Sequence, residues 1–121
     1  MGLYVDGYVL AVPKRKIAAY RRIAKLAGKI WREHGALDYK ECIGDDLKKT
    51  KCTAPFSQMI KLKPGETVVF SYIVFKSRKD RDRVNAKVMK DPRIKEGVND
   101  QPMPFDMKRM TYGGFKVLID A

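Results

Sequence analysis

The chain has 121 residues, of which 45% are hydrophobic and 33% are charged, and its formal net charge is +12 at pH 7. This length fits one domain over residues 1–121, and the apolar fraction excludes an intrinsically disordered chain. No apolar run approaches the roughly 20 residues of a membrane-spanning helix, and the N-terminus does not resemble a signal peptide. We therefore expect a cytoplasmic protein without a membrane partner.

Residues 3–12 form the first predicted strand, with apolar side chains alternating to both of its faces. Pro13 has a fixed φ that suits a first helical position, so a helix is expected to begin there. Apolar residues then recur at three- and four-residue spacing as far as His34, which indicates an amphipathic helix, and Gly35 favours its left-handed stop. Gly28, inside this helix, would let it sit close to the sheet.

Residues 37–43 form a second predicted strand, whose cleaner alternation places it half exposed at a sheet edge. Residues 47–63 are harder to assign, because residues 56–62 suit either a short strand or one helical turn. A third strand is predicted over residues 67–75, and it is again apolar on both faces.

Ser77 is the predicted N-cap of a second helix, because Asp80 follows three residues later as in a capping box. Three apolar residues form the predicted inner face of this helix: Val84, Val88 and Met89. A short helical turn is predicted over residues 93–98, a loop over 99–108, and a last two-faced strand over 109–119.

The predicted order of strand, helix, strand, strand, helix and strand is that of the ferredoxin-like βαββαβ fold. This is an α+β architecture with two main helices on one face of an antiparallel sheet, so the other face needs a separate cover. Burying six large apolar side chains there would contribute about 1.5–3 kcal/mol each. We expect the sheets of two chains to pack as a dimeric α+β barrel, and the alternative cover is the 47–63 segment of the same chain.

The excess positive charge lies mostly on the two predicted helices. The first carries eight basic residues against the single acid Glu33. Such faces attract polyanions by counterion release, so an RNA- or DNA-associated protein is an alternative. No arginine–glycine tract, zinc finger or aromatic RNA-binding signature accompanies the charge, and a solvated basic face is the simpler interpretation.

Candidate pocket residues are polar side chains in otherwise apolar strands. Asp6 shares a face with Tyr8, and Arg109 begins the last strand, which we expect beside the first. An internal carboxylate is costly unless it is paired, so an Asp6–arginine or Asp6–tyrosine contact is expected. Together with Tyr39 and Tyr112, these residues either line a small polar-capped cavity or form a buried network that fixes strand register or the dimer.

The single histidine, His34, would suit a general base or an axial ligand, although a partly buried histidine at a helix C-terminus is the simpler interpretation. Met103, Phe105 and Asp106 belong to an apolar loop that is either a lid over a pocket mouth or an arm that packs on a partner subunit. One histidine without a thiolate cluster gives little support to zinc or haem, and we expect neither a metal nor a cofactor.

Four strings of the sequence carry a resemblance to a known family: YVDGYVLAVPK, WREHGALDYKECIGDD, NAKVMKDPR and MPFDMKRMTYGGF. They resemble the bacterial YbaA-like family of unknown function, over residues 4–119, with residues 47–63 matching least well. That family is similar in fold to the dimeric α+β barrel superfamily, which includes cofactor-free monooxygenases, isomerases and haem enzymes. The resemblance implies a two-chain barrel and brings no established activity.

The sequence therefore predicts a cytoplasmic homodimer that binds a small molecule in a pocket on the inner sheet face. Such a protein is either a binding module or a cofactor-independent enzyme. The alternatives are a nucleic-acid-associated protein that uses the basic helical faces, and a structural or interaction protein without a ligand.

Overall fold

A computed structural model describes residues 2–121 and contains one antiparallel sheet of four strands in the order β2–β3–β1–β4. The strands are β1 (Tyr4–Pro13), β2 (Asp38–Ile43), β3 (Glu66–Phe75) and β4 (Thr111–Lys116). The helices are α1 (Ile17–His34), α2 (Phe56–Met59), α3 (Arg78–Lys90) and α4 (Pro92–Ile94). Shorter turns are the 3-10 segments η1 (Lys14–Lys16) and η3 (Met107–Arg109) and the π-helical segment η2 (Lys95–Asn99). The predicted order of the main elements is confirmed.

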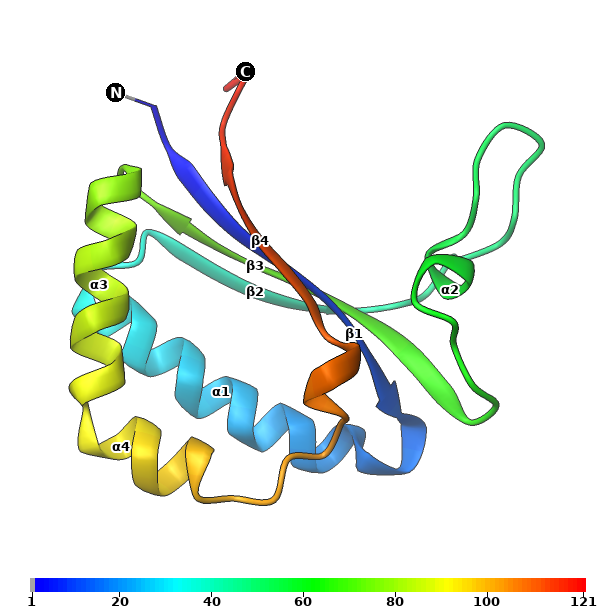
Figure 1. The fold of residues 1–121 in the computed structure, drawn as a ribbon, viewed down its shortest axis with the longest axis horizontal. Coiled ribbons are helices and arrows are strands. Elements are labelled where there is room, and N and C mark those ends of the chain that lie inside the picture. Colours follow the sequence, from blue (N-terminus) through cyan, green and yellow to red (C-terminus); the bar gives the residue numbers. More distant parts are fainter. Residues whose placement is uncertain (1) are drawn as a thin grey trace.

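Helices α1, α3 and α4 lie on one face of the sheet (Figure 1). Their buried side chains meet the strands in one core cluster, in which Ile30, Phe75, Val84 and Val88 are fully buried. This is the face to which the even-numbered residues of β1 point, since side chains alternate along a strand. The helix-covered face therefore contains Asp6 as well as the apolar core.

Helix α1 begins later than the predicted start at Pro13. It ends at the stop that was predicted from Gly35. Pro13 is the last residue of β1, and the η1 turn separates it from Ile17, the first residue of α1. Gly35 has a φ of +122°, which other residues rarely adopt, and its backbone N–H caps the last turn of α1.

The predicted cap of α3 is confirmed, because the backbone N–H of Asp80 donates to the Ser77 hydroxyl at 3.1 Å. The predicted inner face is wrong at one position: Val84 and Val88 are fully buried, whereas Met89 is 58% exposed. Val84 and Val88 are four residues apart and lie on one side of the helix, while Met89 is rotated by about 100° from Val88.

The 47–63 segment covers only one end of the other sheet face. It contains the single-turn helix α2, and Ile60 packs there against Ala11 and Val68. The Phe56 ring stacks on Phe70 at a centroid distance of 6.3 Å, yet Phe70 stays 43% exposed. The alternative prediction, in which the 47–63 segment alone covers this face, is therefore wrong.

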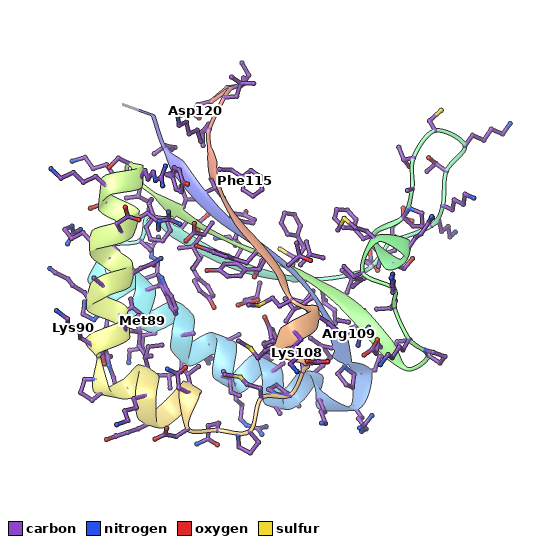
Figure 2. All side chains as sticks on the ribbon, in the orientation of Figure 1. Met89, Lys90, Lys108, Arg109, Phe115 and Asp120 are labelled. Carbon is purple, nitrogen blue, oxygen red and sulfur yellow. The ribbon has the colours of Figure 1, made fainter. Side chains whose placement is uncertain are left out.

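The uncovered remainder of that face is an apolar surface that we call the open-face patch. Its members alternate with the core residues along β1, β3 and β4: Val5, Val9, Phe70, Tyr72, Val74 and Phe115. Phe115 is 61% exposed, and Figure 2 shows its ring on the side of β4 away from α3.

Strand β4 is shorter than its sequence pattern predicts. It starts at Thr111 opposite Val9 and ends at Lys116, and the chain beyond it leaves Leu118 91% exposed. None of the helices in residues 2–121 combines the length and the apolar character needed to cross a bilayer.

Gly28 brings α1 into direct contact with β2. A Cβ atom at this position would lie 2.8 Å from the ring of Tyr39. We expect Gly28→Ala to destabilise the protein by about 1–2 kcal/mol, because displacing a packed ring outweighs the gain in helix propensity. Urea unfolding measures this, with Arg22→Ala on the exposed side of α1 as the control. A Gly28→Ala protein as stable as the control would contradict the contact.

Candidate functional site

Two hollows between α1 and the sheet share a common wall. The inner pocket has a volume of about 190 Å³ and is bounded by the helix-covered face of the sheet, by α1 and by residues 103–110. The outer groove has a volume of about 590 Å³ and runs between α1 and the edge strand β2. The side chains of Tyr20, Tyr39 and Glu41 line both of them.

Glu41 holds the two tyrosines of this wall. The Tyr20 hydroxyl donates to one carboxylate oxygen at 2.7 Å, and the Tyr39 hydroxyl donates to the other at 2.6 Å. Burial raises the pKa of both tyrosines far above the ordinary value, and the negative charge of Glu41 raises it further. Both phenols therefore stay protonated and act as donors to the carboxylate at neutral pH.

Tyr39 is a predicted pocket residue, whereas Tyr20 and Glu41 were not identified from the sequence. A charged residue on an edge strand is usually solvated, and the amphipathic pattern of α1 assigns Tyr20 only to its apolar stripe. A signal for Glu41 does exist, because it lies two residues from Tyr39 and so points to the same, helix-covered face.

The walls of the inner pocket are mainly apolar, and aliphatic and methionine side chains make up most of them. Five rings from β1, α1, β2 and the loop between η2 and η3 also line it: Tyr8, Tyr20, Trp31, Tyr39 and Phe105. The rings of Trp31 and Tyr39 lie 6.3 Å apart, and Phe105 meets Tyr20 edge-on at 5.7 Å. The Trp31 indole N–H donates to Asn85 at 2.9 Å, which fixes the ring. Tyr8 has a raised pKa, mainly from burial and next from Asp6.

The expected arginine partner of Asp6 comes from α3 and is not Arg109. Asp6 is fully buried, and the Arg81 guanidinium donates to it at 2.7 Å and to the Tyr112 hydroxyl at 3.0 Å. Asn85 makes a longer contact of 3.5 Å to the second Asp6 oxygen. Tyr112 also packs on Tyr8 with 4.9 Å between ring centroids. Asp6, Tyr8 and Tyr112 thus form a network at the sheet that extends to the inner pocket.

Arg109 lies away from this network, in the η3 turn before β4 (Figure 2). Its guanidinium pairs with Glu66 at 2.6 and 2.8 Å and lowers the pKa of Glu66 to about 2. Glu66 faces Pro13 at the far end of β1 from Asp6, because the strands run antiparallel. The register of β4 on β1 places Gly114, and not Arg109, opposite Asp6.

His34 also lies outside both hollows. Its Nε2 atom is 2.8 Å from an Asp91 oxygen, and Asp91 accepts two further side-chain bonds from Arg93. Arg93 and then His34 hold the pKa of Asp91 well below its ordinary value. This cluster ties the end of α1 to the start of α4.

The loop residues Met103 and Phe105 line the inner pocket of their own chain. Asp106 does not reach the pocket, because its carboxylate caps η3 by accepting the Lys108 backbone N–H at 3.0 Å. The outer groove has an apolar floor and a basic rim on α1, formed by Arg21, Lys25, Lys29 and Arg32.

The family of the chain follows from comparison with known proteins. Residues 3–107 match the family described as "Protein of unknown function (DUF1428)". The chain belongs to this family. It is also 47% identical over 117 residues to "Uncharacterized protein YbaA" of Escherichia coli K12 and to the protein of that name in Shigella flexneri, and each alignment covers 97% of both chains. The resemblance to YbaA-like proteins is thereby confirmed.

Solved structures confirm the ferredoxin-like α+β fold. A NIPSNAP family protein of unknown function from Agrobacterium tumefaciens has a TM-score of 0.61 at 14% identity, covering 96% of this chain and 88% of its own. A dimeric ferredoxin-like protein from an uncultured marine organism has a TM-score of 0.58 at 12% identity, with full coverage of both chains. At these identities the likeness concerns the fold alone.

We expect Arg81→Met to destabilise the protein by about 3–5 kcal/mol, because it leaves the buried Asp6 carboxylate without its charged partner. Adding Asp6→Asn to that variant should restore part of the loss. Arg83→Met is the control, since Arg83, whose side chain is 48% exposed, forms a partly exposed pair with Asp80, and losing this pair should cost at most about 1 kcal/mol. Urea unfolding compares the variants, and equal losses for Arg81→Met and Arg83→Met would contradict a structural role of the buried pair.

Proposed function

We propose that this protein is a homodimer that binds a small molecule in the inner pocket of each subunit. The observation that carries the proposal is an apolar hollow, lined by aliphatic and methionine side chains and five aromatic rings, with a carboxylate, Glu41, in its wall. Small-molecule sites are usually concave and apolar, with a few placed polar groups that orient the ligand. A reaction is not part of the proposal, although hydroxyl groups and one carboxylate, Glu41, line this pocket.

Residues 103–110 would act as the lid of this pocket. Met103, Phe105, Met107 and Met110 contribute to its lining, and the segment joins α4 and η2 to the edge strand β4. Methionine side chains adapt their shape at low cost, which suits a wall that must open and repack around a ligand. Their packing on their own subunit favours a lid over an arm that reaches a partner.

The open-face patch supports the dimer. It presents Phe70 and Phe115, which are 43% and 61% exposed, on the sheet face opposite the helices. A second sheet of the same kind is a self-complementary cover for it, and one solved neighbour is described as a dimeric ferredoxin-like protein. In this arrangement the two ligand pockets lie on the helix-covered faces of the sheets, which point away from each other, and not on the inner, barrel-facing side that the sequence predicted.

The two alternative functions rest on weaker features. Association with RNA or DNA would use the basic rim of the outer groove, but the apolar floor there is not a feature of phosphate binding. A structural protein without a ligand would have no need for a hollow beside a carboxylate, since filling it with side chains would add stability.

Toluene is a suitable first probe of the inner pocket, because the single tryptophan, Trp31, lines it. We expect toluene to shift the indole N–H resonance of Trp31 in a saturable way. Ala27→Leu places a larger side chain in the pocket and should abolish the shift, whereas Ala18→Leu on the exposed side of α1 should leave it intact. A Trp31 resonance that toluene does not move, or moves equally in Ala27→Leu, would refute the pocket.

Replacing Phe115 by lysine should weaken self-association by 30-fold or more, as expected for about 2 kcal/mol lost at a central aromatic contact. Sedimentation velocity at micromolar concentration would show wild-type particles of twice the 13.9 kDa chain mass and smaller Phe115→Lys particles. Met89→Lys is the matched control, because Met89 is similarly exposed but lies on α3. A wild-type protein that sediments as a monomer would refute the dimer.

A further inference from the structure

Resting on the proposed function, we propose that the inner pocket selects a small organic cation with a compact quaternary or tertiary ammonium group. Five aromatic side chains from four parts of the chain surround the hollow: Tyr8, Tyr20, Trp31, Tyr39 and Phe105. The faces of such rings carry partial negative charge and attract ammonium groups, most strongly where water is excluded.

The charge of the lining has one sign. Among the described residues that line the inner pocket, Glu41 carries the only charged side chain, although the whole chain has a net charge of +12. The basic residues of α1 border the outer groove instead, on the other side of the Tyr20–Glu41–Tyr39 wall. A cation in the inner pocket would therefore meet an anion and aromatic rings, without a facing lysine or arginine.

Glu41 can interact with a bound cation while it accepts hydrogen bonds from the two tyrosines. Each of its oxygens accepts one phenol hydrogen bond, at 2.7 and 2.6 Å, and a carboxylate oxygen has two lone pairs. The negative field of Glu41 extends across the hollow, because it contributes to the raised pKa of Tyr8, Tyr20 and Tyr39 alike. The phenols remain neutral at physiological pH, so they add no competing charge.

An anionic ligand fits this lining poorly. It would lie beside Glu41, and the two phenol hydroxyls of the wall are already donated to that carboxylate. The indole N–H of Trp31 is engaged by Asn85, so the hydroxyls of Tyr8 and Ser71 are the other neutral donors of the lining, and no cationic side chain of residues 2–121 faces the hollow. The volume of about 190 Å³ is below the 300–1,000 Å³ typical of drug-sized ligands, so the bound molecule must be small.

Three probes of nearly the same shape separate charge from size. Choline carries a trimethylammonium group, 3,3-dimethylbutan-1-ol has the same outline without charge, and 3,3-dimethylbutanoate carries a negative charge. Titrations monitored by the Trp31 indole resonance should give a choline affinity at least tenfold higher than that of the neutral alcohol, with the anion weakest.

Glu41→Gln tests the source of the selectivity. The amide keeps the size of the side chain and an oxygen acceptor, so choline affinity should fall about tenfold while the affinity of the neutral alcohol stays unchanged. Glu33→Gln is the matched control, since Glu33 is an exposed acid of α1 that pairs with Arg93 outside the pocket. The comparison of the three probes on the unaltered protein remains decisive even if Glu41→Gln fails to fold.

The outcomes separate this inference from the function on which it rests. Equal or tighter binding of the neutral alcohol or the anion overturns cation selection, and the pocket itself stands. If choline does not bind while toluene shifts the Trp31 indole resonance, cation selection is likewise overturned and the pocket stands. Failure of every probe, toluene included, overturns the small-molecule pocket and the cation inference together.

Discussion

Strands β1 and β3 pair over ten residues and alternate apolar side chains to both faces, and the structure depends on how each face is covered. Helices α1, α3 and α4 cover one face and build the core around Phe75 and Ile30. The other face receives only the 47–63 segment at one end, which leaves Phe70 and Phe115 exposed. Because monomeric proteins rarely expose contiguous apolar patches larger than a few hundred square ångströms, this asymmetry is the physical reason for proposing self-association.

The helix-covered face combines the core with polar groups that position the candidate site. Asp6 anchors α3 to the sheet through Arg81, at a desolvation cost that the ion pair offsets. Gly28 lets α1 lie against Tyr39, and Glu41 then fixes Tyr39 and Tyr20 as one wall. The inner pocket lies between these two anchoring points and is bounded by α1, the strands and residues 103–110.

The distribution of charge distinguishes the two hollows. Basic residues of α1 border the outer groove and contribute to the long-range positive field of the molecule. The inner pocket is screened from them by neutral rings and contains the Glu41 carboxylate. For the proposed ligand site we therefore expect local contacts, rather than net charge, to set the preference, because Coulomb interactions are stronger in a low-dielectric interior than across solvent.

Patterns in the amino-acid sequence were enough to predict the order of the elements, the Ser77 cap, the Gly35 stop and the edge position of residues 37–43. These features depend on local periodicity and backbone preference, which neighbouring residues fix. The same patterns placed Asp6 and Tyr8 on one strand face and required an arginine or tyrosine near Asp6. The packing of α3 on the sheet, a property of the tertiary structure, selects Arg81 for this contact.

The tertiary structure likewise decided that Arg109 and His34 pair elsewhere, and that Tyr20 and Glu41 meet in one wall. Periodicity states which face a side chain occupies, but not the rotation of a helix over the sheet or the residue at which a strand begins. Contacts between elements far apart in sequence depend on those two quantities, so the site could be predicted only in part.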